Sequence, residues 1–98
     1  MTQDSNSQIV IDLAHQGDSQ AQYKLGLMYE LGMGIDKDLN QAFAWYQKSA
    51  DQEYAKAQYN LGIFYALAKG VEKDIEQSKY WVKKAHENGY SGSGSSIF

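Results

Sequence analysis

Cysteine and arginine are absent from this 98-residue chain, and it has no long hydrophobic run. Without cysteine, disulfide bonds and thiolate chemistry are excluded. A membrane-spanning helix needs about 20 consecutive apolar residues, and the opening MTQDSNSQ has neither the basic nor the apolar region of a secretory signal. We therefore expect a cytoplasmic protein without a membrane span.

All nine basic residues are lysines. Because the planar guanidinium of arginine is the usual group for bidentate recognition of phosphates and bases, its absence argues against a nucleic-acid partner. The net charge of −3 is unevenly distributed: residues 1–54 carry eight acidic residues and three lysines, and residues 55–98 carry four and six. This difference in sign is compatible with a homodimer or with head-to-tail self-association.

One segment of the sequence occurs twice. The stretch AQYKLGLMYELGMG at residues 21–34 returns as AQYNLGIFYALAKG at residues 57–70. Across residues 21–54, 14 of the 34 positions are identical to the residue 36 places later, where about 2 matches would be expected by chance. A repeat of this length indicates a solenoid, in which each unit buries its apolar face against its neighbours.

Each repeat is predicted to contain two helices. In residues 19–31 the apolar side chains recur at spacings of three and four, which is typical of an amphipathic helix. Asp18 or Ser19 can cap its start, and Gly32 can adopt the left-handed conformation that ends it. A second helix is expected over residues 39–52.

The start of that second helix has the pattern of a capping box, with Asp38 followed three residues later by Gln41. The second repeat follows the same order and predicts helices over residues 55–67 and 75–88. Glycines 26 and 62 fall inside predicted helices, at a cost of about 1 kcal/mol each relative to alanine. A close approach of the second helix of each repeat would explain them.

The residues before the first repeat also fit its register. Shifted by 36 positions, SQIVIDLAHQG corresponds to the second helix of a repeat, so we expect a lone helix that caps the stack. Its Ile9, Val10, Leu13 and Ala14 would cover the first repeat. The predicted organisation is a capping half-repeat over 1–18, repeats over 19–54 and 55–90, and a flexible C-terminal tail over 91–98.

The first repeat contains the pattern LGxxYxxGxGxxxDxxxAxxWYxKSA, formed by Leu25, Gly26, Tyr29, Gly32, Gly34, Asp38, Ala42, Trp45, Tyr46, Lys48, Ser49 and Ala50. Through this pattern the chain resembles the Sel1-like repeat family, a relative of the tetratricopeptide repeats. Three positions depart from the repeat pattern: Ala68 and Glu53 stand where glycine is expected, and Ser78 where alanine is expected. The resemblance implies an all-α solenoid of antiparallel helix pairs.

The resemblance also implies a non-catalytic module that binds a protein or peptide on a concave surface lined by the first helix of each repeat. The partner-binding residues would then be Tyr23, Leu27, Glu30, Leu31, Lys56, Tyr59, Asn60, Ile63 and Ala66. Both predicted first helices are apolar around more of their circumference than one buried face requires. The second apolar face is either buried inside the stack or forms a groove for the partner.

No motif for catalysis, a cofactor or a metal ion emerges. His15 and His86 have no second ligand at a suitable spacing, so we assign them structural or solvated roles. Asp36, Asp38 and Asn40 imitate the start of a calcium loop, but the required glycine does not follow, and Asp38 is better explained as a helix cap. Tryptophans 45 and 81 occupy equivalent positions and are predicted to be buried.

Two alternative functions remain at this point. The small size is compatible with a bacterial inhibitor or immunity-like protein dedicated to one toxin or enzyme. Hydrolase activity, discussed for the cysteine-rich branch of the family that the chain resembles, fits less well because cysteine is absent.

Overall fold

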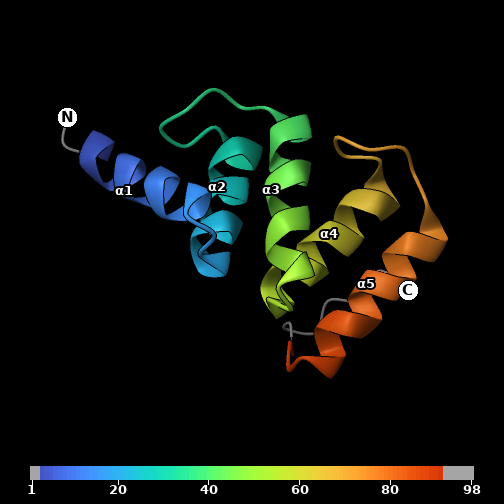
Figure 1. Ribbon diagram of the computed structural model, residues 1–98. Helices are drawn as coiled ribbons and strands as arrows, with labels where there is room; N and C mark the ends of the chain where they lie inside the picture. Colours follow the sequence, from blue (N-terminus) through green and yellow to red (C-terminus); the bar gives the residue numbers. More distant parts are fainter. Residues whose placement is uncertain (1–2, 92–98) are drawn as a thin grey trace.

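The computed structural model describes residues 3–91, which form five α-helices and no strand (Figure 1). The helices are α1 (Gln3–His15), α2 (Ser19–Leu31), α3 (Leu39–Asp51), α4 (Ala55–Leu67) and α5 (Ile75–Glu87). They form an elongated array of 41 × 24 × 23 Å in which the main contacts join helices that are consecutive in the chain. The predicted all-α solenoid is confirmed. Apart from Ser91, the predicted tail lies outside the described residues.

Aspartate side chains begin three of the helices. Asp18 accepts a hydrogen bond of 2.8 Å from the backbone N–H of Ala21, and Asp38 accepts one of 3.1 Å from the N–H of Gln41. A capping box also requires the Gln41 side chain to accept from the N–H of Asp38, and this part of the prediction is wrong. The N–H of Asp38 donates instead to the carbonyl of Tyr29 at 2.9 Å. The connection between α2 and α3 returns to the end of α2 and so satisfies this donor without the Gln41 side chain.

The second repeat closes its loop in the same way. The N–H of Asp74 donates to the carbonyl of Tyr65 at 3.0 Å, and the Asp74 carboxylate caps α5 by accepting from the N–H of Gln77 at 3.1 Å. Helix α4 differs, since Tyr54 at its start provides no side-chain cap. Both connections therefore bind the start of the second helix to the end of the first.

Two positions at which another residue replaces the expected glycine, Ala68 and Glu53, keep a left-handed backbone conformation. Gly32 ends α2 with φ = 69°, and Ala68 ends α4 with φ = 56°. Glu53 has φ = 67° in the turn between α3 and α4. A left-handed conformation costs a residue with a Cβ about 1–2 kcal/mol, so the second repeat keeps the loop geometry of the first at an energetic cost.

The glycines inside α2 and α4 mark helix crossings, as predicted. A Cβ on Gly26 would lie 2.5 Å from Cδ1 of Tyr46 on α3. A Cβ on Gly62 would lie 2.7 Å from Cγ2 of Val82 and 3.0 Å from the carbonyl oxygen of Ser78, both on α5. Each glycine therefore provides the space in which the two helices of its repeat meet.

Helix α1 packs on α2, but with a different set of side chains from the predicted one. Ala14 is buried, and Val10 packs against the same cluster, as expected. Ile11, which was not predicted, also packs there. Ile9 and Leu13 are 56% and 41% exposed, so their assignment to this contact is wrong.

The repeat register explains the exposure of Ile9 and Leu13. The residues 36 positions later are Trp45 and Ser49, which face α2, the first helix of their own repeat. Trp45 packs into the cluster shared with α2, and the Ser49 hydroxyl donates to the carbonyl of Ser19 at 2.7 Å. Among the described residues, no helix precedes α1 to cover the corresponding face.

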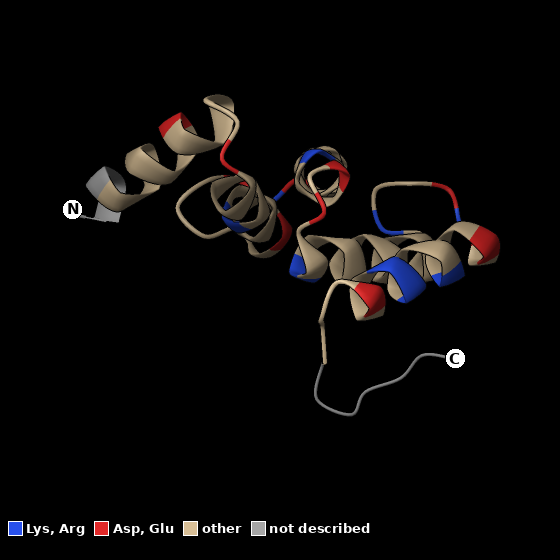
Figure 2. Cartoon of the chain, turned by 60° about the horizontal axis from the view of Figure 1, so that its bottom comes forward, with Lys and Arg blue, Asp and Glu red and all other residues tan. Residues whose placement is uncertain are grey.

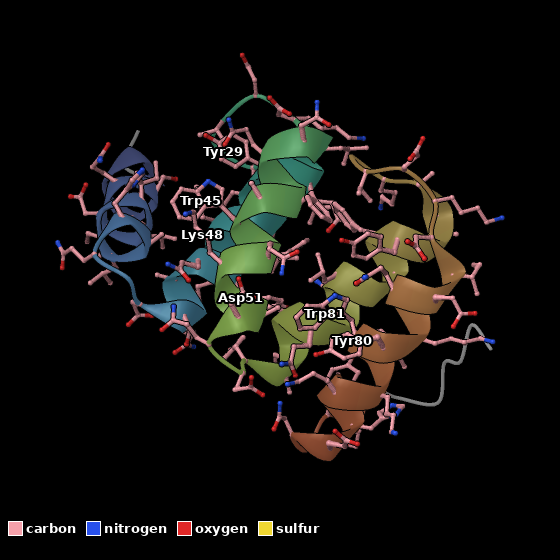
Figure 3. All side chains as sticks on the ribbon, turned by 45° about the vertical axis from the view of Figure 1, so that its right-hand side comes forward. Tyr29, Trp45, Lys48, Asp51, Tyr80 and Trp81 are labelled. Carbon is pink, nitrogen blue, oxygen red and sulfur yellow. The ribbon has the colours of Figure 1, made fainter. Side chains whose placement is uncertain are left out.

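Both tryptophans are buried, as predicted, with 8% and 9% exposure for Trp45 and Trp81. Trp45 lies on the side of α3 that faces α1 (Figure 3). The edge of the His15 ring meets it with the ring centroids 5.0 Å apart, and the Lys48 ammonium lies 5.7 Å from the Trp45 ring. His15 thus has the predicted structural role.

Candidate functional site

The nine residues predicted to bind a partner lie on α2 and α4, and none of them is fully buried. Leu31, at 60% exposure, and Lys56 are the most accessible. The other seven are half-buried: Tyr23, Leu27, Glu30, Tyr59, Asn60, Ile63 and Ala66. Their side chains therefore contribute to packing and also reach the surface.

Three of the predicted residues meet around the hydroxyl group of Tyr46. This fully buried tyrosine of α3 donates a hydrogen bond of 2.7 Å to Oε1 of Glu30. The side chain of Asn60 lies near the hydroxyl groups of both Tyr46 and Tyr23. Burial, together with the bond to Glu30, raises the pKa of Tyr46 far above its usual range, so the phenol remains a donor.

Glu30 also links the two repeats. Its Oε2 atom lies 2.8 Å from the ammonium of Lys69, which follows α4. Only 18% of the Glu30 side chain is exposed, and the Lys69 ammonium also lies 5.1 Å from the ring of Phe64. Lys69 was not predicted from the sequence. The equivalent residue of the first repeat is the uncharged Met33, so the repeat pattern does not indicate an ion pair at this position.

Tyrosine pairs occur at equivalent places in the two repeats. The rings of Tyr23 and Tyr54 are 5.4 Å apart, and those of Tyr59 and Tyr90 are stacked at 4.5 Å. Burial is the main cause that raises the pKa of Tyr23 and of Tyr90. A shallow groove of about 540 Å³ adjoins the second pair and is lined by Glu53, Tyr54, Ala55, Lys56, Asn88, Gly89, Tyr90 and Ser91.

One wall of this groove is an organised carboxylate. Glu53 accepts hydrogen bonds of 3.0 Å from the amide of Asn88 and 3.3 Å from the ammonium of Lys84. These two bonds, that of Asn88 first, hold the pKa of Glu53 below its usual value. The interactions tie the turn between α3 and α4 to the end of α5.

Two buried glutamines connect successive repeats. Gln22 donates from Nε2 to the carbonyl of Ala14, and Gln58 donates to the carbonyl of Ala50, both at 3.1 Å. The Oε1 atom of each glutamine also accepts a 2.8 Å bond from the residue that ends the second helix of its own repeat, which is Gln52 for Gln22 and Asn88 for Gln58. Sequence reasoning missed this role, although the identity of the two residues across the repeats was a signal.

The candidate metal ligands and histidines have other surroundings in the described part of the chain. Within residues 3–91, no group of three or more His, Cys, Asp or Glu side chains could hold a metal ion. Asp38, considered as a calcium ligand, is used as the cap of α3. Exposed His86 lies beside Tyr90, with a ring separation of 6.5 Å. No helix of the described region is long and apolar enough to cross a membrane.

Charge is distributed unevenly along the array. Figure 2 shows several lysines on α5, at one end of the protein, whereas α1 at the other end carries none. Two of them, Lys79 and Lys83, stand at the register positions of Phe43 and Gln47. The outer side of α5 is therefore more polar than the side of α3 that receives α4.

The fold and the repeated contacts define a helical solenoid repeat protein. The sequence model of the Sel1 repeat matches residues 19–54 and 55–90. The chain therefore belongs to the Sel1 repeat family. Repeats of this family commonly mediate protein–protein interaction and are typically non-catalytic scaffolds.

Solved structures and curated relatives agree with this assignment. A Sel1 repeat protein from Oxalobacter formigenes is 36% identical, with a TM-score of 0.85, over 88% of this chain and 35% of the other. Cysteine rich protein B from Helicobacter pylori shares the fold, with a TM-score of 0.87 and 24% identity over 92% of this chain and 68% of the other. The rat "DAP3-binding cell death enhancer 1" is 49% identical over 37 residues, 38% of this chain and 7% of its own length.

Proposed function

We propose that this chain is a non-catalytic interaction module that binds a protein or peptide through the accessible side of α2 and α4. The observation that carries the proposal is the set of seven half-buried side chains on these helices, which includes two tyrosines. Tyrosines that are packed on one side and accessible on the other are typical of binding hot spots. The cytoplasmic location expected from the sequence stays a prediction.

The chemistry of this surface suits a peptide with both apolar and charged groups. Ile63 and Leu31 provide apolar contact area, and Lys56 lines the groove beside Tyr90. Tyr23, Glu30 and Asn60 are held in place by their contacts with Tyr46, so binding would not have to order them. Ile63, Leu31, Lys56 and the accessible side of Tyr23 are therefore assigned to direct contact. Glu30 and Asn60 are assigned to its support.

The test compares two double variants of matched chemistry. The first, Lys56→Glu with Ile63→Ser, changes the proposed surface, and the second, Lys79→Glu with Ile75→Ser, makes the same changes on α5. Circular dichroism first establishes that both are folded. Proteins captured from a native lysate are then identified by mass spectrometry, purified and titrated against each chain.

We expect one partner to bind the wild type and the α5 variant equally and the first variant at least about tenfold more weakly. If both variants bind the partner as tightly as the wild type does, α2 and α4 do not form the site. The number of proteins captured also separates an adaptor from a dedicated inhibitor, because an inhibitor should bind a single partner tightly.

A further inference from the structure

A groove between α1 and α2 lies outside the set of contacts described so far. It has a volume of about 560 Å³, within the range of small-ligand and side-chain pockets. Its lining is mostly apolar and consists of Asn6, Ser7, Val10, Lys24, Leu27, Met28, Met33 and Gly34. Of these residues, only Leu27 was predicted to bind a partner.

The junction between α1 and α2 has the same register as the junction between α3 and α4. The hydrogen bond from Gln22 to the carbonyl of Ala14 corresponds to the bond from Gln58 to the carbonyl of Ala50, with the same length of 3.1 Å. The helix residues around this bond can therefore be compared with those 36 positions later. The loop ends differ, since Gly34 lies against Ser7 whereas Gly70 lies against Leu39.

An aromatic side chain fills the corresponding space at the second junction. There, the ring of Tyr46 meets the ring of Phe64 edge-on at 5.1 Å, and its hydroxyl group is near Asn60. Phe43 packs beside it, with its ring 5.4 Å from that of Tyr65. Tyr46 is fully buried in this position.

The first junction contains smaller residues at the two aromatic positions. Val10 replaces Tyr46, and Ser7 replaces Phe43. The opposite wall keeps its apolar character, since Met28 stands for Phe64. The groove is therefore the space that a tyrosine occupies at the next step of the same array.

We propose that this groove binds a tyrosine or phenylalanine side chain of a peptide segment from a partner protein, placed as Tyr46 is placed at the second junction. The methionines at positions 28 and 33 provide thioether groups, which pack favourably on aromatic rings. Lys24 lines the groove at the register position of Asn60, and its ammonium can donate a hydrogen bond to a bound hydroxyl group, which favours tyrosine over phenylalanine. This site rests on the proposed function and names a ligand class for one end of the binding surface.

The test uses the full chain and three peptides of sequence Gly-Ser-X-Ser-Gly with blocked ends, in which X is tyrosine, phenylalanine or leucine. NMR spectra of the methionine methyl groups are recorded during each titration. We expect ring-current shifts of the Met28 and Met33 methyl signals with tyrosine, smaller shifts with phenylalanine and none with leucine. Absence of such shifts at millimolar peptide would overturn the proposal.

The decisive variant is Val10→Tyr, which restores the residue found at the second junction. Its ring should fill the groove and weaken binding of the tyrosine peptide by about tenfold or more. The control is Ile9→Tyr, on an exposed position of the same helix. If Val10→Tyr does not fold, Met33→Lys, which places a residue equivalent to Lys69 at the edge of the groove, takes its place.

A folded Val10→Tyr chain that binds the tyrosine peptide as well as the wild type does would overturn the groove as the site. The Lys56→Glu, Ile63→Ser variant could lose partner binding while Val10→Tyr binds both the partner and the tyrosine peptide in full. That result would keep the proposed function and reject the groove. Loss of tyrosine-peptide binding in Val10→Tyr alone would support the groove.

Discussion

The hydroxyl group of Tyr46 donates a hydrogen bond of 2.7 Å to Glu30, which also pairs with Lys69 at 2.8 Å. The carboxylate therefore joins both helices of the first repeat to the loop of the second. Because Glu30 and Lys69 are 39 positions apart, the interaction is a contact between repeats and depends on their correct stacking.

Replacing Tyr46 with phenylalanine should lower the free energy of unfolding by about 1–2 kcal/mol, since hydrogen bonds to charged groups contribute about 1.5–3 kcal/mol and Lys69 still pairs with Glu30. Urea denaturation followed by circular dichroism measures the change. Tyr80→Phe removes a hydroxyl group from a residue that is 52% exposed and is the control. Equal stability of the two variants would contradict the role of the Tyr46 hydroxyl group.

Ala68→Gly should stabilise the protein by about 0.5–1 kcal/mol. Glycine avoids the cost of the left-handed conformation at φ = 56°, and this gain exceeds the entropy that glycine loses on folding. Ala66→Gly, a helical position on α4, should instead destabilise by a similar amount. Melting temperatures of the two variants should therefore move in opposite directions from the wild type.

Two buried serines should respond oppositely to substitution by alanine. Ser78 is fully buried, and its Oγ has no hydrogen-bond partner, so Ser78→Ala should stabilise by about 1 kcal/mol. The Ser49 hydroxyl donates to the carbonyl of Ser19 at 2.7 Å, so Ser49→Ala should destabilise by about 1 kcal/mol. Chemical denaturation of both variants tests this, and effects of the same sign would be inconsistent with it.

The stabilisation contributed by Glu53 should depend on pH. Its bonds to Asn88 and Lys84 lower its pKa in the folded state. The contribution is therefore fully present above the unfolded-state pKa of about 4.5 and is lost as the pH falls through the lower pKa of the folded state. Glu53→Gln should lower the melting temperature at neutral pH more than at pH values below that range.

The control for this pH dependence is Glu72→Gln, which alters an exposed carboxylate in the loop before α5. Its effect on the melting temperature should be small and should not show the pH dependence expected for Glu53→Gln. A Glu53→Gln effect that is constant across the acidic range would contradict the assigned role of the carboxylate.

Helix positions could be predicted from the sequence because they depend on local chemistry. Spacing of apolar residues, together with Asp18 and Gly32, located α2 without reference to any other helix. The internal repeat then allowed each inference to be made twice. The close crossing at Gly26 was predictable for the same reason, since a helical glycine that recurs at the same position indicates a shared packing constraint.

Contacts with a specific neighbour could not be predicted in this way. Ile9 and Leu13 are apolar, but whether they are covered depends on a helix that would precede α1. Gln58 is polar, and sequence pattern alone places such a residue at the surface, whereas here a carbonyl of the preceding repeat satisfies its amide. The Glu30–Lys69 pair likewise exists only because stacking brings two repeats together.

The glutamine links also affect how such an array can change in length. Each link ends on a backbone carbonyl, of Ala14 or Ala50, and every residue carries that acceptor. A repeat can therefore dock on a preceding helix without a matching polar side chain on that helix. Duplication or loss of a 36-residue unit leaves this part of the junction intact, so the number of repeats is free to vary while the geometry of each step is retained.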